Sequence, residues 1–111
     1  MTDDFPDARR ALETLGELVA RVSDTYAERC DIDRDRDWSA LKLAEETGEL
    51  VAANLKLTGR GRRARLSEAE MRQSLEDEAA DVFAMLVLYC RENSIDLVDA
   101  LDRKWFRYLK D

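Results

Sequence analysis

The sequence predicts an all-helical fold, and three observations point to it. The 111 residues include one proline and four glycines, so few positions favour turns or interrupt helices. Hydrophobic residues make up 45% of the chain and charged residues 39%, a mixture that suits amphipathic helices. Apolar residues recur at helical spacing along most of the chain. At this length we expect one domain, residues 1–111, with a single core.

The first helix is expected from Pro6 to Cys30, because proline is favoured in the first turn of a helix. The next segment, residues 31–37, mixes acidic residues with arginines and is expected to be a solvated connector that ends in an N-cap, Asp37. Apolar residues at helical spacing support the first helix: Phe5, Leu12, Leu15, Val19, Val22 and Tyr26.

The second helix is expected from Trp38 to Leu57, where a glycine-containing segment, residues 58–63, ends it. The third helix is expected to begin with a capping box formed by Ser67 and Glu70 and to run to a break at residues 93–94. Its second half is apolar nearly all round, and such a helix is buried on more than one side. We therefore expect a second subunit to cover part of it, in a homodimer or homotetramer whose helices form a bundle.

The fourth helix is expected from Ile95 to Leu109. It presents an apolar side at helical spacing. The residues of that side are Leu97, Leu101, Trp105 and Tyr108.

Charge and residue content exclude several classes of function. The net charge of -7 argues against a nucleic-acid surface, which needs an excess of basic residues. The absence of histidine removes the usual zinc sites and the Ser-His and Cys-His nucleophiles. The longest apolar stretch, Val82–Cys90, is far shorter than the roughly 20 residues that span a bilayer. We expect a cytoplasmic protein without a membrane partner, in which Cys30 and Cys90 are reduced and structural.

Two acidic signatures dominate the sequence. Glu45, Glu46 and Glu49 lie in the second predicted helix, and Glu78 and Asp81 lie in the third. Residues three or four apart share a helix face, so two such helices packed together would bring four or five carboxylates into one place. Oxygen ligands without histidine or thiolate suit Mg²⁺, with Mn²⁺ as an alternative, and Mg²⁺ commonly takes phosphate oxygens as further ligands. A solvated acidic helix face is the other interpretation of Glu45, Glu46 and Glu49.

Basic and aromatic residues fit a phosphorylated substrate. Lys42 lies one turn before Glu46, and Lys104 and Arg107 share a face of the fourth predicted helix. For Lys104 and Arg107 the alternative is a favourable interaction with the negative end of the helix dipole. Trp38 is a candidate to stack on a nucleotide base, although a tryptophan at this spacing is commonly a core residue.

These residues together resemble the MazG-like, all-alpha nucleoside triphosphate pyrophosphatases. The pattern of that family is E-E-x-x-E followed, after a loop, by E-x-x-D. Here Glu45-Glu46-Thr47-Gly48-Glu49 and Glu78-Ala79-Ala80-Asp81 match it in order and separation, and Lys104-Trp105-Phe106-Arg107 resembles the basic tail motif of the family. The similarity runs from Trp38 to Tyr108.

The resemblance implies an oligomeric enzyme that hydrolyses a nucleoside triphosphate between the alpha and beta phosphates. The products would be the monophosphate and pyrophosphate, with non-canonical or surplus nucleotides as the substrates of a cleansing function. Glu45 and Glu46 would be catalytic, Glu45 by positioning or deprotonating the attacking water, and Lys42, Lys104 and Arg107 would stabilise phosphate charge. The metal ligands would be Glu46, Glu49, Glu78 and Asp81.

Two other functions stay open at the level of the sequence. One is a non-catalytic helical oligomer that binds a nucleotide or a partner helix through the acidic groove. The other is a purely structural bundle, on which Mg²⁺ would have no stabilising effect.

Overall fold

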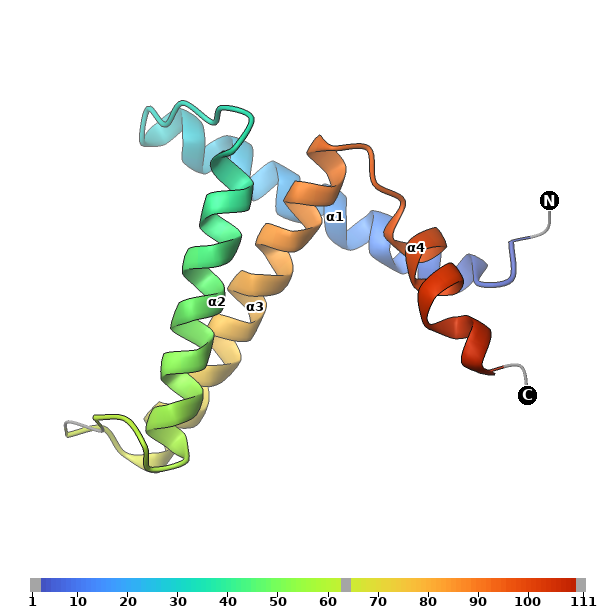
Figure 1. The fold of residues 1–111 in the computed structure, drawn as a ribbon. Coiled ribbons are helices and arrows are strands. Elements are labelled where there is room, and N and C mark those ends of the chain that lie inside the picture. The colour runs from blue at the N-terminus through green and yellow to red at the C-terminus, as the bar shows by residue number, and fades with distance from the viewer. Residues whose placement is uncertain (1–2, 63–64, 110–111) are drawn as a thin grey trace. The chain divides into compact units, whose positions relative to one another are not determined.

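A computed structural model describes residues 3–62 and 65–109, and every regular element within those ranges is a helix (Figure 1). The all-helical prediction is therefore confirmed. In chain order the elements are α1 (Pro6–Arg29), α2 (Trp38–Leu57), α3 (Glu68–Glu92), α4 (Leu97–Lys104) and a short 3-10 helix, η1 (Phe106–Leu109).

Local signals set most helix ends. The capping box at the start of α3 is present: the Glu70 backbone N–H donates to the Ser67 hydroxyl at 3.1 Å, and the Ser67 N–H donates to the Glu70 carboxylate at 3.0 Å. Asp37 is the N-cap residue of α2, although its side chain makes no capping hydrogen bond. Helix α1 ends at Arg29, one residue before the predicted end at Cys30.

The fourth helix is shorter than predicted at both ends. It begins at Leu97 and not at Ile95, because the Asp96 side chain caps it by accepting from the Asp99 backbone N–H at 3.0 Å. It ends at Lys104, and the chain then tightens into η1. Within η1, the Phe106 ring packs on the Phe5 ring with 4.8 Å between ring centroids, a contact that accounts for the change of path.

The chain divides into two compact units, and α3 contributes to both. The first unit contains residues 1–33 and 87–111. Gly16 is buried there, and a Cβ atom at this position would lie 3.3 Å from Val87 Cγ1, so the absence of a side chain lets α1 and the end of α3 approach closely. The other buried apolar residues of this unit are Ala27, Val87, Leu88, Cys90 and Val98.

An arginine joins two parts of the first unit that are distant in sequence. The Arg9 guanidinium forms ion pairs with Asp3 (2.8 Å), with Asp99 (2.6 Å) and with Asp96. The negative charges of these carboxylates stabilise the guanidinium cation. The pKa of Asp96 lies below its usual value because Asp96 accepts hydrogen bonds, first from the Asp99 N–H and then from Arg9. The start of α4 is thereby fixed to α1.

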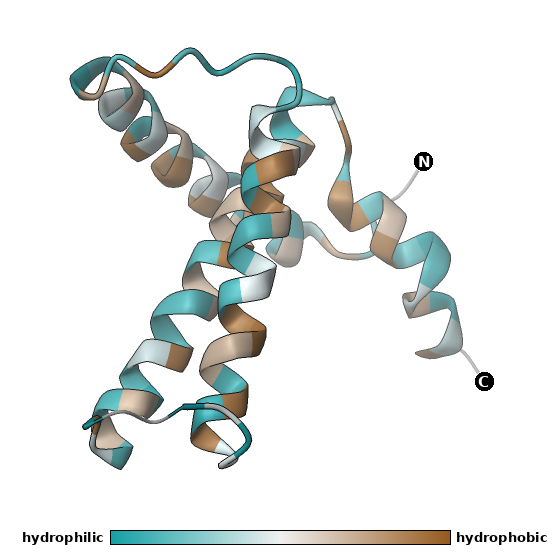
Figure 2. Ribbon diagram, turned by 60° about the vertical axis from the view of Figure 1, so that its left-hand side comes forward, coloured by the Kyte–Doolittle hydropathy of each residue, from teal (hydrophilic) through white to brown (hydrophobic). Residues whose placement is uncertain are grey.

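The second unit contains residues 34–86, in which α2 and the first part of α3 lie side by side as a hairpin (Figure 1). Ser39, Ala53 and Met71 are buried in this unit. Hydrophobic and hydrophilic residues alternate along the helices (Figure 2), and several large apolar side chains stay exposed, among them Leu41, Val51 and Phe83. The hairpin therefore buries little apolar surface of its own.

Several predicted apolar positions are exposed in the first unit. Leu15, Val22 and Tyr26 on α1, and Trp105 and Tyr108 after α4, each leave more than two fifths of their surface in contact with solvent. Cys90 is buried and Cys30 is exposed, and both are free thiols. Burial raises the pKa of the Cys90 thiol. Among the described residues, no helix has the length and hydropathy that a membrane span requires.

Candidate metal site

Three carboxylates converge between the two helices of the second unit. Glu46 and Glu49 lie one turn apart on α2, and Glu78 lies on α3. One carboxylate oxygen from each residue lies within 4.8 Å of the other two. We call Glu46, Glu49 and Glu78 the acidic triad. Helical spacing places the two α2 residues on one face, and the hairpin places that face against α3.

Two oxygens of the triad are buried without a hydrogen-bond donor. Oε2 of Glu46 and Oε2 of Glu78 are shielded from solvent, and neither has a hydrogen-bond partner among the described residues. A buried carboxylate oxygen with no donor is costly when the group is ionised. The fold pays this cost at two adjacent positions, a pattern more typical of a binding site than of a solvated helix face.

The pKa values of Glu46 and Glu78 reflect the same environment. Burial is the main cause that raises the pKa of Glu46 to about 7, followed by hydrogen bonding and charge repulsion with Glu49. The pKa of Glu78 is also raised, first by burial and then by Glu49. Glu49 is exposed and lies next to both Glu46 and Glu78, which are half-buried.

Asp81 lies outside the triad but close to it. Its charge raises the pKa values of both Glu46 and Glu78, although Asp81 itself is exposed. The structure therefore places all four predicted metal ligands in one region of the second unit, with Asp81 at its exposed edge. Their role as ligands stays a prediction.

Lys42 and Glu45 form an ion pair beside the triad. The Lys42 ammonium lies 3.1 Å from the Glu45 carboxylate, three residues further along α2. The positive charge of Lys42 also lowers the pKa of Glu46, against the larger effects that raise it. Glu45 is exposed and paired with a cation, whereas Glu46 is half-buried.

The remaining predicted site residues lie in different parts of the chain. Trp38 is the first residue of α2, half-buried in the second unit. Lys104 and Arg107 belong to the first unit, at the end of α4 and in η1. The Arg107 guanidinium donates to the Tyr108 hydroxyl at 2.7 Å and lies 4.8 Å from the centre of that ring. Their roles toward phosphate or base stay predictions.

The triad fits a hard divalent cation. Its donors are all carboxylate oxygens, the ligands that Mg²⁺ and Mn²⁺ prefer. A cation would satisfy the two buried oxygens that have no donor. It would also stabilise the ionised forms of Glu46 and Glu78, which burial and then the neighbouring Glu49 disfavour. The exposed side of the cluster, at Glu49 and Asp81, leaves room for further ligands.

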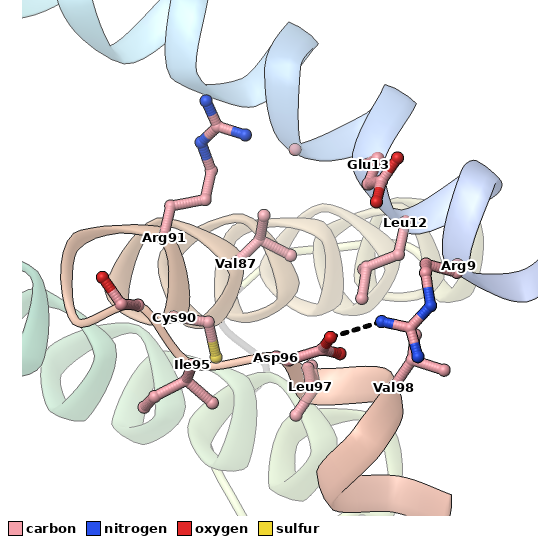
Figure 3. A pocket seen from close by; sticks show the side chains of 12 residues that line it. Arg9, Leu12, Glu13, Val87, Cys90, Arg91, Ile95, Asp96, Leu97 and Val98 are labelled. Carbon is pink, nitrogen blue, oxygen red and sulfur yellow. Dashed lines mark hydrogen bonds and ion pairs between the residues drawn. The ribbon is translucent and has the colours of Figure 1, made fainter. Parts of the chain in front are cut away.

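A cavity in the first unit was not anticipated from the sequence. It has a volume of about 320 Å³ and is lined by α1, the end of α3 and the turn that leads to α4 (Figure 3). Leu12, Val87 and Cys90 contribute apolar surface, whereas Arg91 and Glu13 contribute charge. Its residues are up to about ninety positions apart in the chain, so no local motif indicates it.

Comparison of the chain with protein-family models, with curated proteins and with solved structures finds no match.

Proposed function

We propose that this protein is a Mg²⁺-dependent nucleoside triphosphate pyrophosphohydrolase, a cytoplasmic homo-oligomer that acts in the cleansing of nucleotide pools. The observation that carries the proposal is the acidic triad, in which Glu46, Glu49 and Glu78 approach within 4.8 Å and two oxygens are buried without donors. The resemblance of the E-E-x-x-E and E-x-x-D motifs to MazG-like enzymes supplies the reaction class.

Each acidic residue then has a proposed role. Glu46, Glu49, Glu78 and Asp81 would hold Mg²⁺, with Mn²⁺ as an alternative. The bound ion would supply neutralisation of phosphate charge and a water of lowered pKa. Glu45 would orient the attacking water from its exposed position, where it forms an ion pair with Lys42.

The basic residues would act on the substrate. Lys42 lies 3.1 Å from Glu45 at the margin of the triad, which supports a role in stabilising phosphate charge there. Lys104 and Arg107 are proposed for the same role, and Trp38 is proposed to contact the base.

The test is product analysis with a panel of canonical and modified nucleoside triphosphates. We expect monophosphate and pyrophosphate with Mg²⁺ and no product with a chelator. Glu49→Gln and Asp81→Asn should each lower turnover by about 100-fold or more, because each removes a proposed metal ligand. Glu76→Gln, at an exposed carboxylate of α3 outside the triad, is the matched control and should retain activity.

The outcomes separate the candidate functions. Circular dichroism should show unchanged helix content in Glu49→Gln and Asp81→Asn, so lost turnover can be assigned to the site. Full activity in both variants would contradict the proposal. Saturable nucleotide binding with no product from any nucleotide would favour a non-catalytic binding module.

A further inference from the structure

Helix α1 carries a second apolar face that stays about half-exposed or more to solvent. At 100° per residue, Leu15, Leu18, Val22 and Tyr26 fall within about 80° of the helix circumference. These four side chains are 46%, 50%, 71% and 57% exposed. The opposite side of the helix contains Gly16 and Ala27, which are buried in the first unit. We call the exposed set, Leu15, Leu18, Val22 and Tyr26, the outer stripe.

Basic residues flank the C-terminal part of the outer stripe. Arg21 and Arg29 lie beside Leu18, Val22 and Tyr26 on the same helix. A monomeric protein seldom leaves a continuous row of large apolar side chains exposed, and such a row commonly marks a contact surface. We therefore expect another surface to pack against the outer stripe.

Charge at the two ends of the stripe indicates which occupant fits. On the same side of the helix, Asp7 lies before the stripe and Arg29 lies after it, about 33 Å apart along the axis. Between Asp7 and Arg29, this side of α1 carries no charged residue. Ala8 and Ala11 extend the apolar row of the outer stripe toward Asp7. The Asp7 carboxylate is 97% exposed, and its contact with Arg10 is loose at 3.8 Å. One end is therefore negative and the other positive.

We propose that a second copy of this chain covers the outer stripe, with the two α1 helices antiparallel about a twofold axis. This arrangement places Asp7 of each copy near Arg29 of the other and stacks the two apolar rows between these pairs. A parallel pair would instead bring like charges together at both ends. The stripe is self-complementary in the antiparallel direction only.

The inference is independent of the proposed chemistry. The acidic triad lies in the second unit, whereas the whole outer stripe lies in the first. Failure of nucleotide hydrolysis would leave the contact between copies untouched, and the response of the triad to Mg²⁺ can be measured in any stripe variant.

The test is a dilution series of the full chain by sedimentation velocity. We expect a reversible dimer, and Val22→Glu should raise its dissociation constant at least about 30-fold, because it places a charge at the centre of the stripe. Gln73→Glu is the matched control: it adds the same charge at an exposed position of α3 and should change the constant by less than about threefold. Val22 is exposed, so the fold of the monomer should survive.

Charge reversal tests the direction of the helices. Asp7→Arg and Arg29→Asp should each weaken the dimer about fivefold, since the twofold axis repeats each change, and the double variant should return to within about threefold of the original. A chain that is monomeric at every concentration would overturn the proposal. A dimer that Val22→Glu leaves unchanged would also overturn it.

Discussion

At Glu46 the fold holds a carboxyl group where its ionised form is costly. Burial and the neighbouring Glu49 raise its pKa from 4.5 to about 7. A carboxyl with a raised pKa binds its proton more tightly in the folded state, so protonation stabilises the fold. The stabilisation by the bound proton is fully present below pH 4.5, the pKa of this carboxyl group in the unfolded chain. It is lost as the pH rises through about 7, the pKa in the folded chain.

The metal-free protein should therefore lose stability between pH 5 and pH 8. In the presence of a chelator, the melting temperature should fall by several degrees across this window, because Glu46 must ionise in a buried place. Thermal melts followed by circular dichroism measure the effect. The pKa of Asp96 is lowered, so its contribution changes only below its usual value of 3.8, outside the window.

Two variants isolate the contribution of Glu46. Glu46→Gln removes one titrating group of the triad and should make the fall in melting temperature smaller, with the remainder due to Glu78, whose pKa is also raised by burial. Glu76→Gln, outside the triad, should leave the fall as steep as in the unchanged chain. A fall of equal size in Glu46→Gln would show that another group is responsible.

At the scale of the element, the capping box at the start of α3 is a local device with a measurable effect. Ser67→Ala removes the hydroxyl that accepts from the Glu70 N–H. We expect the free energy of unfolding to fall by about 1 kcal/mol, the usual cost of losing such a cap. Urea titration measures it.

A hydroxyl inside a helix provides the comparison for Ser67→Ala. Thr14 is exposed in the middle of α1, where its hydroxyl donates to the Arg10 carbonyl at 3.0 Å. Thr14→Ala should leave stability unchanged or slightly raised, because alanine is the better helix former. Equal losses in both variants would argue that the effect of Ser67→Ala is not one of capping.

The sequence predicted helix bounds best where nearby residues determine them. Helix α2 has its predicted bounds, Trp38–Leu57, and α3 begins at the predicted capping box, because caps, glycines and apolar spacing act within a few residues. The fourth helix is different. Its end at Lys104 goes with the packing of Phe106 on Phe5, a contact between residues 101 positions apart that no local pattern contains.

In the candidate site, too, some features follow from local sequence and others depend on tertiary packing. Spacing alone places Glu46 and Glu49 on one face of a helix, and that part was predictable. The position of Asp81 at the exposed edge depends on how the hairpin packs. Lys42 and Glu45 are three residues apart on one helix, so their spacing permits the ion pair, but its formation depends on side-chain conformation. The apolar spacing of α1 also could not show that half of its apolar residues face outward.

At the scale of the whole molecule, a bound metal would appear as added stability. A ligand that binds only the folded chain stabilises it by about 2.7 kcal/mol when its concentration is 100 times its dissociation constant. We expect Mg²⁺ at millimolar concentration to raise the melting temperature, and addition of a chelator to reverse the rise. The comparison is best made near pH 8, where Glu46 is ionised.

The metal response should depend on the triad. Glu49→Gln should abolish the rise in melting temperature, while Glu76→Gln should retain it. A rise of the same size in both variants would assign the effect to nonspecific screening of a chain with a net charge of -7. No rise in the unchanged chain would favour a purely structural bundle.

The ion pairs of Arg9 also bear on the order in which the chain folds. Arg9 meets Asp96 and Asp99 across separations of 87 and 90 residues, so these contacts close a loop of almost the whole sequence. Because closing a long loop costs entropy, we expect these contacts to form after the local helices and the continuous hairpin of residues 34–86. During synthesis, the first unit cannot be completed until its last segment has left the ribosome. Until residues 87–111 are synthesised, the apolar residues of α1 that pack against them remain exposed.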